Sequence, residues 1–297
     1  MPTQETIETI AEDAGKWRRH LHQNPELLFD LPVTSAFVAD KLKSFGCDEV
    51  VTGIAKSGVV AVVKGKLGAG RTIGLRADMD ALPIAEQTNL GHASKNPGKM
   101  HACGHDGHTA MLLGAARHLA STRDFAGTAV LIFQPAEEGG AGGRVMLEEG
   151  LLERFGIEEV FGMHNEPGLP VGSFAIKPGP MLAAADRFVV KLNGKGSHAA
   201  SPHESRDPVL IAAHLVTALQ SIASRNVDPF DPVVVSVTYL AGGSAAALNV
   251  IPEQAVVGGT IRTIDAKTRK AVEQRFRDIV ANTARLFEAQ AEIDWRP

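Results

Sequence analysis

Cysteine and histidine are dense in the segment 101–108, which reads His-Ala-Cys-Gly-His-Asp-Gly-His. Cys103 and His105 stand two positions apart with a glycine between them, so both side chains can face one point from a turn. Thiolate and imidazole are the softer protein ligands and suit zinc or a similar ion. The segment therefore indicates a metal site, although histidines also gather near helix starts without binding a metal.

A pair of carboxylates, Glu137 and Glu138, follows an apolar run in the Gly-rich segment 133–140. Adjacent carboxylates point in different directions, so one can hold a metal while the other stays free to take a proton. Metal-assisted hydrolysis requires this division of labour. Taken alone, such a pair is more often a solvated turn.

Two more polar residues come directly after apolar runs. His164 follows the run 159–163, and Asp80 comes shortly after the run 72–75. Asp80 could orient a metal-binding side chain by accepting hydrogen bonds, or could simply form a turn before Leu82 and Pro83. Because ligands bind outside the carboxyl ends of parallel strands, we expect all these clusters to converge at one edge of a sheet.

The elements that must position these residues alternate along the first part of the chain. Helical periodicity is present at 5–23, 34–45 and 108–120, and strand-like apolar runs at 58–63, 72–75, 129–133 and 159–163. This alternation predicts an α/β domain with a mainly parallel sheet.

A proline- and glycine-containing stretch at 175–185 predicts a hinge. The pattern after it is a strand, a helix, two strands, a helix and a strand, at 186–192, 207–223, 232–240, 254–263, 267–289 and 291–295. That order is typical of a ferredoxin-like α+β domain. We therefore expect two domains, residues 1–183 and residues 184–297.

The second domain offers three polar residues that could meet a substrate. His198 sits in a predicted turn among small residues, which allow close approach of another chain or a ligand. Asn249 and Arg262 could grip a carboxylate, and arginine suits that task through its planar fork. Each could equally be an ordinary surface side chain.

Composition excludes several classes of protein. A chain of 297 residues is too long for one ordinary core, and its formal net charge of -4 argues against a nucleic-acid binder. The polar N-terminal stretch lacks the apolar core of a signal peptide, and no apolar run reaches the length of a membrane span. The two cysteines, Cys47 and Cys103, make a disulfide framework unlikely, and a cytoplasmic location follows by default.

Taken together, the motifs resemble the aminoacylase and carboxypeptidase type of dinuclear metallohydrolase, in the branch with hippurate hydrolase and auxin-conjugate amidohydrolases. The resemblance rests on the segments 18–27, 76–83, 100–106, 134–139, 162–164, 196–200 and 249–252. They follow the family order over nearly the whole chain.

The resemblance implies a metal-dependent amidohydrolase that cleaves the amide bond of N-acyl amino acids or related conjugates. It implies that two divalent ions, zinc or manganese with nickel or cobalt as further options, are bound by Cys103, His105, Glu138 and His164. Other roles follow the same resemblance: Glu137 as general base, Asp80 as supporting carboxylate, His198 in the active site of a partner subunit, and Asn249 and Arg262 on the substrate. The small domain would serve as lid and homodimerisation domain.

The chain departs from the family pattern at its C-terminal end. The family continues past the small domain with a segment that completes the first sheet and supplies one more metal-binding histidine, whereas this sequence ends at Pro297. We therefore expect an incomplete catalytic domain. Two other interpretations stay open: a cysteine hydrolase that uses Cys103 as its nucleophile, and a non-catalytic form that only dimerises or binds.

Overall fold

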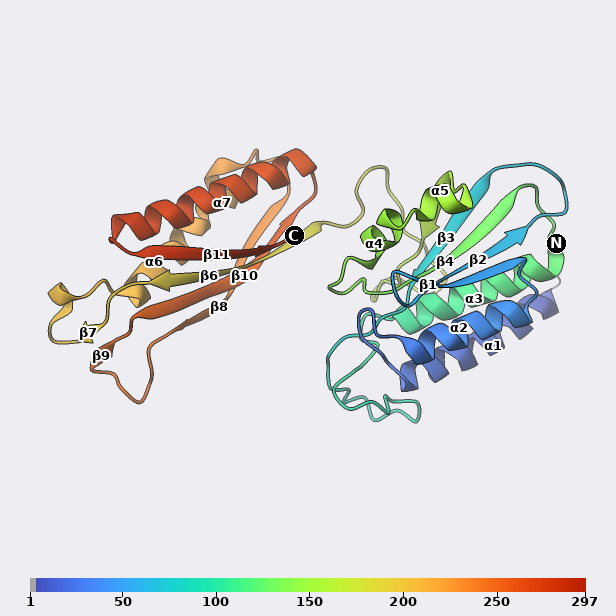
Figure 1. Ribbon diagram of the computed structural model, residues 1–297, viewed down its shortest axis with the longest axis horizontal. Helices are drawn as coiled ribbons and strands as arrows, with labels where there is room; N and C mark the ends of the chain where they lie inside the picture. Colours follow the sequence, from blue (N-terminus) through green and yellow to red (C-terminus); the bar gives the residue numbers. More distant parts are fainter. Residues whose placement is uncertain (1–3) are drawn as a thin grey trace. The chain divides into compact units, whose positions relative to one another are not determined.

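Two units, each built on its own sheet, make up the chain in the computed structural model, which describes residues 4–297 (Figure 1). The units are Met1–Pro170 and Val171–Pro297. The sequence places the domain boundary later, between 183 and 184. Residues 171–183 contain no helix or strand, so this stretch is the connection that the hinge prediction describes.

The sheet of the first unit has five strands in the order β1-β2-β4-β3-β5. Their bounds are Glu49–Ile54 (β1), Gly58–Lys64 (β2), Thr72–Asp78 (β3), Thr128–Gln134 (β4) and Glu159–Gly162 (β5). β3 pairs in parallel with both β4 and β5, while β2 runs antiparallel to β4 and to β1. The α/β prediction is confirmed, but the sheet is mixed rather than mainly parallel, because two of its four strand pairings are antiparallel. The parallel part of the sheet carries the polar strand ends.

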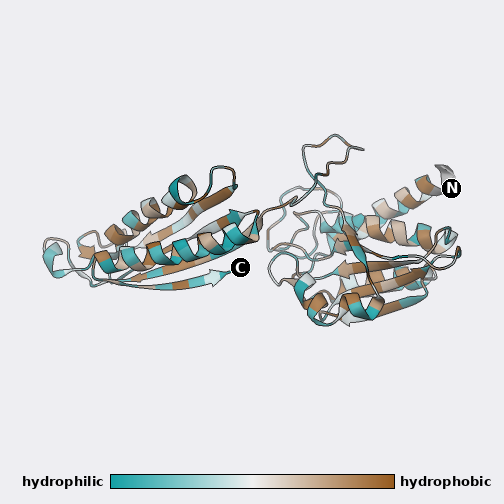
Figure 2. Cartoon of the chain, turned by 90° about the horizontal axis from the view of Figure 1, so that it is seen from above, coloured by the Kyte–Doolittle hydropathy of each residue, from teal (hydrophilic) through white to brown (hydrophobic). Residues whose placement is uncertain are grey.

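Helices cover both faces of this sheet (Figure 1). One face packs against α2 (Pro32–Ser44) and α3 (His105–Thr122), with α1 (Gln4–Gln23) packed on α3, and the other against the short α4 (Gly142–Glu148) and α5 (Leu151–Phe155). Successive side chains of a strand point to opposite faces, so Leu131 and Phe133 join the first core while Val130 and Ile132 join the second. Hydrophobic residues accordingly dominate these strands (Figure 2).

The core beneath α3 should set much of the stability of the first unit. Phe133 is fully buried in it, so Phe133→Ala is expected to lower the free energy of unfolding by about 3–5 kcal/mol. Phe161→Ala on β5 is the matched control, because that ring is 54% exposed and its loss should change stability by less than about 0.5 kcal/mol. Equal effects of the two substitutions in chemical denaturation would contradict this description of the core.

The second unit has a four-stranded antiparallel sheet in the order β11-β6-β10-β8. Its strands are β6 (Ala184–Asn193), β8 (Val233–Gly242), β10 (Gln254–Thr263) and β11 (Gln290–Arg296), and its helices are α6 (Pro208–Leu219) and α7 (Ala266–Leu286). The order β6-α6-β8-β10-α7-β11 with this sheet is the ferredoxin-like arrangement that the sequence predicts. Asp207 and Asp265 cap the two helices with their carboxylates.

Smaller elements extend this unit. A two-stranded ribbon pairs β7 (Ser197–His198) with β9 (Val250–Ile251). A 3₁₀ turn spans Pro202–Glu204, and a π-helical turn at Ile222–Asn226 follows α6. Across the described residues, no helix is both long and apolar enough to cross a membrane.

Candidate metal centre

Three parallel strands deliver polar side chains to one edge of the first sheet. β3 ends at Asp78 and leads to Asp80, β4 ends at Gln134 and leads to Glu137 and Glu138, and β5 ends at Gly162 and leads to His164. The strands point the same way, so these residues meet at the carboxyl edge. The structure thus brings together the polar clusters that the sequence expects to converge.

The start of α3 brings Cys103 and His105 to the same edge. His105 is the first residue of the helix, and Gly104 before it has a φ of 87°, a backbone conformation that favours glycine. A Cβ atom at Gly104 would lie 2.6 Å from Oδ1 of Asn165, so a larger residue would also displace the side-chain amide of Asn165. The glycine between Cys103 and His105 is therefore a geometric requirement.

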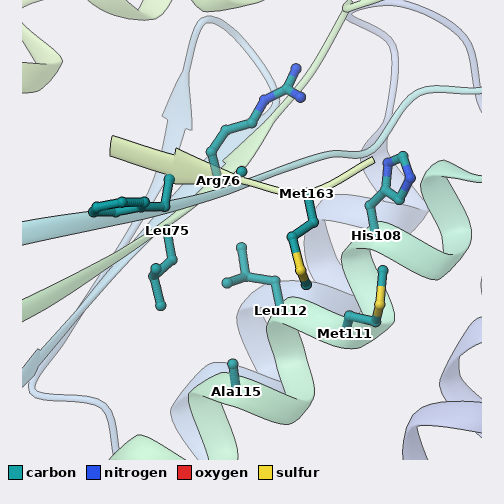
Figure 3. A pocket seen from close by; sticks show the side chains of 9 residues that line it. Leu75, Arg76, His108, Met111, Leu112, Ala115 and Met163 are labelled. Atoms are coloured by element: carbon teal, nitrogen blue, oxygen red, sulfur yellow. The ribbon is translucent and has the colours of Figure 1, made fainter. Parts of the chain in front are cut away.

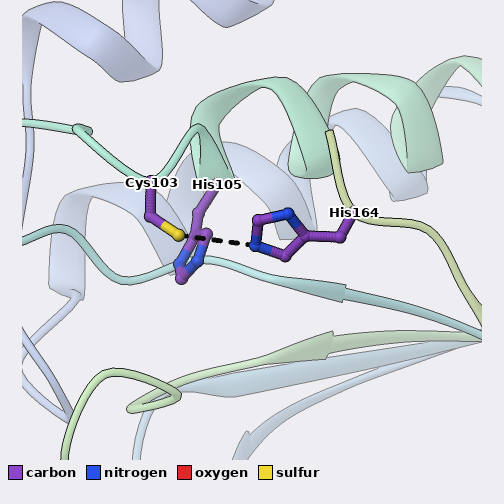
Figure 4. Close-up of side chains that lie close together, drawn as sticks. All are labelled: Cys103, His105 and His164. Atoms are coloured by element: carbon purple, nitrogen blue, oxygen red, sulfur yellow. Dashed lines mark hydrogen bonds between the residues drawn. The ribbon is translucent and has the colours of Figure 1, made fainter. Parts of the chain in front are cut away.

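Ligand atoms of Cys103, His105 and His164 lie within 4.8 Å of one another (Figure 4). Sγ of Cys103 is 3.4 Å from Nε2 of His164. A second group of His105, Glu137 and Glu138 meets the same limit, with Nε2 of His105 3.7 Å from Oε1 of Glu138. His105 belongs to both groups, so the two groups of donors adjoin each other.

Buried polar atoms without a hydrogen-bond partner lie where these two groups of donors meet. Both ring nitrogens of His105 and Oε1 of Glu138 are buried, and none has a hydrogen-bond partner among the described residues. Leaving a buried polar group unpaired costs about 1–3 kcal/mol, so native proteins rarely tolerate three in contact. A divalent cation would satisfy these lone pairs, and the mixed sulfur, nitrogen and oxygen donors fit such an ion.

Asp80 fixes the backbone of the carboxylate pair. Its side chain is buried and accepts hydrogen bonds from the backbone N–H groups of Glu137 (2.9 Å) and Glu138 (3.1 Å). The preceding Ala136 has a φ of 53°, an uncommon conformation for a residue with a Cβ. Asp80 also lies 3.6 Å from Nδ1 of His105, so one carboxylate faces three of the groups at the centre.

The charges around Cys103 suppress its thiolate. Burial and the neighbouring carboxylates Glu138, Glu137 and Asp78 raise the pKa of this thiol to about 12. A nucleophilic cysteine needs the opposite environment, in which cations or a helix N-terminus lower the pKa. The carboxylates that oppose a thiolate would attract a divalent cation, so this environment favours Cys103 as a ligand over Cys103 as a nucleophile.

Metal affinity should therefore increase with pH. The thiol of the metal-free protein holds its proton at neutral pH, and a ligating cysteine must release it. Affinity should rise by about tenfold or more per pH unit between roughly pH 6 and pH 8, and this slope should shrink in Cys103→Ser. Cys47→Ala is the control, because burial raises the pKa of that thiol too, to about 11, but Cys47 lies outside the centre. Equal metal affinity of the wild-type protein at about pH 6 and about pH 8 would contradict binding of the metal by the Cys103 thiolate.

Glu138 is partly buried, and Glu137 is more exposed than Glu138 but still partly shielded from solvent at its carboxyl group. Burial of its carboxyl group and the charges of Asp78 and Glu138 raise the pKa of Glu137 above its ordinary value. A raised pKa makes a carboxylate a better proton acceptor near neutral pH. The two carboxylates of the pair therefore differ in exposure.

Asp78 and His108 also lie at this edge, although sequence reasoning assigns them no role. Nδ1 of His108 is 2.6 Å from Oδ1 of Asp78, and both side chains are almost fully buried. Burial opposes ionisation of Asp78, but the hydrogen bond from His108 and the positive charge of Arg76 lower its pKa to about 2. The available signal was that His108 follows His105 by three positions, on the same side of a helix.

A pocket of about 230 Å³ borders His108 (Figure 3). Its lining is mostly apolar and comes from β3, α3 and β5, including Leu75, Leu112 and Met163. Met163 directly precedes His164, so packing in this pocket also affects the position of that histidine.

The structure brings together two of the three predicted residues of the second unit. His198 pairs with Val250 in the ribbon, and Asn249 accepts a hydrogen bond from the backbone of Ala199 through its carbonyl, so His198 and Asn249 are neighbours. Arg262 lies near the far end of β10, roughly 27 Å from Gln254 at about 3.4 Å per residue. Arg262 is therefore not grouped with the ribbon inside this unit.

Comparisons with known proteins identify relatives of this chain. A family model described as peptidase family M20/M25/M40 matches residues 74–289. An N-acetyl-L-cysteine deacetylase of Bacillus subtilis strain 168 is 47% identical over 97% of this chain and 68% of its own length. A hippurate hydrolase of Campylobacter jejuni is 46% identical over 94% of this chain and 72% of its own. A crystal structure of a dinuclear metal-binding peptidase of the M20 family from Bacillus subtilis has a TM-score of 0.78 and 40% identity, covering 98% of this chain and 74% of that one.

Proposed function

Since this chain belongs to peptidase family M20/M25/M40, we propose that it is a metal-dependent amidohydrolase that cleaves the amide bond of N-acyl amino acids or related conjugates. The names of its relatives support this substrate class. The observation that carries the proposal is the buried, unpartnered His105 between Cys103, Glu138 and His164. Few arrangements other than a metal site leave such donors facing one another.

Cys103, His105, Glu138 and His164 would hold two divalent ions, as the dinuclear relative does. Such ions would polarise the substrate carbonyl and lower the pKa of a water. The thiolate donor favours zinc, whereas the carboxylate-rich surroundings also suit manganese, cobalt or nickel. Asp80 keeps the Glu137–Glu138 backbone and His105 in place through the contacts described above.

Glu137 is the proposed general base. Its carboxylate oxygen takes a proton from the attacking water and then delivers that proton to the departing amine nitrogen. Asp80 holds the backbone of Glu137, so the side chain starts from a defined position. Its raised pKa suits a group that must both accept and return a proton near neutral pH.

The second unit is proposed as a lid and homodimerisation domain. His198 lies exposed on a ribbon, where a second copy of the chain or a substrate can reach it, and it would stabilise charge on the carbonyl oxygen. Asn249 beside it would bind substrate. Arg262 is exposed at the far end of β10, so its proposed contact with substrate needs a different copy or a different part of the ligand.

Amide hydrolysis by the purified chain tests this function. N-acetylcysteine and N-benzoylglycine are the first substrates, and release of free amine is the readout, before and after chelation and again after adding back zinc, manganese, cobalt or nickel. We expect hydrolysis that chelation abolishes and one of these ions restores. Hydrolysis that survives chelation would support the cysteine-nucleophile mechanism instead. Absence of hydrolysis with every ion would contradict the proposed activity.

A further inference from the structure

His108 lies at the metal centre with both of its ring nitrogens already engaged. Its Nε2 accepts a hydrogen bond from the backbone N–H of Asn165 at 3.0 Å. A nitrogen that accepts carries no proton, so the proton of the neutral ring is on Nδ1 and is donated to Oδ1 of Asp78 at 2.6 Å. Asp78 and Asn165 together therefore fix the orientation and the tautomer of His108.

Asn165 is the link between His108 and His164. Its N–H is held by His108, and its carbonyl oxygen accepts a hydrogen bond of 2.7 Å from Nδ1 of His164. With its proton on Nδ1, His164 presents the lone pair of Nε2 toward Sγ of Cys103. A continuous chain of contacts thus runs from Asp78 through His108 and Asn165 to the ligating nitrogen of His164.

Other contacts hold the same segment against α3. The side chain of Asn165 packs over Gly104, where no Cβ could fit. The rings of His108 and His164 meet edge to face with centroids 4.6 Å apart. The position of His164 after β5 therefore depends on α3, which also carries His105.

We propose that His108, backed by Asp78, is a positioning residue that sets the place and tautomer of His164 through the backbone of Asn165. The consequence for metal binding rests on the proposed metal-dependent function, whereas the hydrogen-bond chain itself involves only side chains and backbone groups of this protein. A histidine that ligates a metal commonly needs such partners to fix its ring, and their loss typically weakens metal affinity by about 10–100-fold.

The competing role for His108 is that of a metal ligand. Ligand atoms of Asp78, His105 and His108 also lie within 4.8 Å of one another. His105 has two unpartnered nitrogens, whereas His108 has none, so His108 could bind an ion only by giving up Asp78 or Asn165. The positioning role needs no such rearrangement.

Two variants of His108 separate its contacts. His108→Phe keeps an aromatic ring beside His164 but removes both hydrogen bonds, and His108→Gln removes the ring but can restore an acceptor for the N–H of Asn165. Thr109→Val is the matched control, because Thr109 is buried on the next position of α3 and bonds the carbonyl of the same Asp78 without touching Asn165.

Cobalt titration with absorption spectra gives the first readout. His108→Phe should bind Co²⁺ about 10–100-fold more weakly than the wild type with an altered ligand-field spectrum, while Thr109→Val binds normally and His108→Gln recovers most of the affinity. Unchanged binding by His108→Phe, or equal weakening by Thr109→Val, would overturn the proposal. Loss of one whole ion with the rest unaffected would make His108 a ligand, which also overturns it.

Histidine nitrogen NMR of the metal-free protein keeps the test independent of the proposed function. Wild-type His108 and His164 should both carry their proton on Nδ1, and the signals of His164 should shift in His108→Phe but not in Thr109→Val. A proton on Nε2 of wild-type His108 would overturn the inference. Ring-nitrogen signals of His164 that do not shift in His108→Phe would overturn it as well. If the wild type bound no cobalt, the proposed function would fail while this measurement still decided the role of His108.

Discussion

Replacing Glu137 by glutamine is expected to lower kcat for hydrolysis of N-acyl amino acids by about 10²–10⁴-fold while the bound divalent ions remain. Glutamine has nearly the same size, and its backbone N–H can still bond Asp80, so the turn after β4 keeps its shape. Its amide cannot accept and return a proton as the carboxylate does. The measurement is kcat with saturating metal, alongside the metal content of the variant.

Glu148→Gln is the control for this substitution. It removes the same charge nearby in the chain, but Glu148 is an exposed residue of α4 that pairs only weakly with Arg144. It should leave both kcat and metal content at wild-type values. Normal turnover by Glu137→Gln would show that another group takes the proton. Loss of metal from Glu137→Gln would instead make Glu137 a ligand.

The second large effect is expected from His105→Ala, which should lose divalent ions and with them all measurable amide hydrolysis. His105 is the member shared by the sulfur- and carboxylate-containing donor groups, so its removal affects every proposed ligand set. The substitution also removes two buried nitrogens for which the described part of the chain, residues 4–297, offers no hydrogen-bond partner. We therefore expect the metal-free variant to fold at least as well as the metal-free wild type.

His118→Ala is the control, since this histidine lies on the same helix and also has a buried nitrogen without a partner, yet lies outside the cluster. It should retain metal and activity. Hydrolysis by His105→Ala at the wild-type rate would rule out the metal centre as drawn. A large loss of metal-free stability in His105→Ala alone would show that its ring is a packing element.

The converging ends of β3, β4 and β5 could be predicted from the sequence, because each is a short apolar run that stops at a polar residue. The carboxyl ends of parallel strands lie at the same edge of a sheet. Apolar runs followed by polar residues therefore predict that Asp80, Glu138 and His164 lie close together. The order of helices and strands in the second unit could also be predicted from the sequence. Its strands are long and alternate between buried and exposed positions, as in β6.

Contacts distant in sequence were not predictable. The hydrogen-bond partners of His108, Asp78 and Asn165, lie 30 and 57 positions away in the sequence. Several other polar residues in segment 101–109 could take the same role, so residue type alone does not single out His108. β1 was missed because it is an edge strand that contains Gly53 and has only one buried residue, Ile54. The ribbon of β7 and β9 is only two residues long on each side, too short for a periodicity.

The position of Arg262 relative to Asn249 could not be predicted from residue type. Residue type suggested that Arg262 and Asn249 could grip a carboxylate, but Asn249 precedes β9 whereas Arg262 lies near the end of β10, eight positions beyond its first residue. A strand rises about 3.4 Å per residue, so a few positions exceed the reach of any side chain. The residue types of Asn249 and Arg262 suggest a shared role, but the fold decides whether the two side chains lie close together.

The number of divalent ions held by the purified chain is the most direct test of the account. Elemental analysis after dialysis against zinc, manganese, cobalt or nickel, followed by metal-free buffer, should find two ions per wild-type chain and none per His105→Ala chain. A wild-type chain that retains no more metal than His105→Ala would contradict the metal centre at the carboxyl edge of β3, β4 and β5.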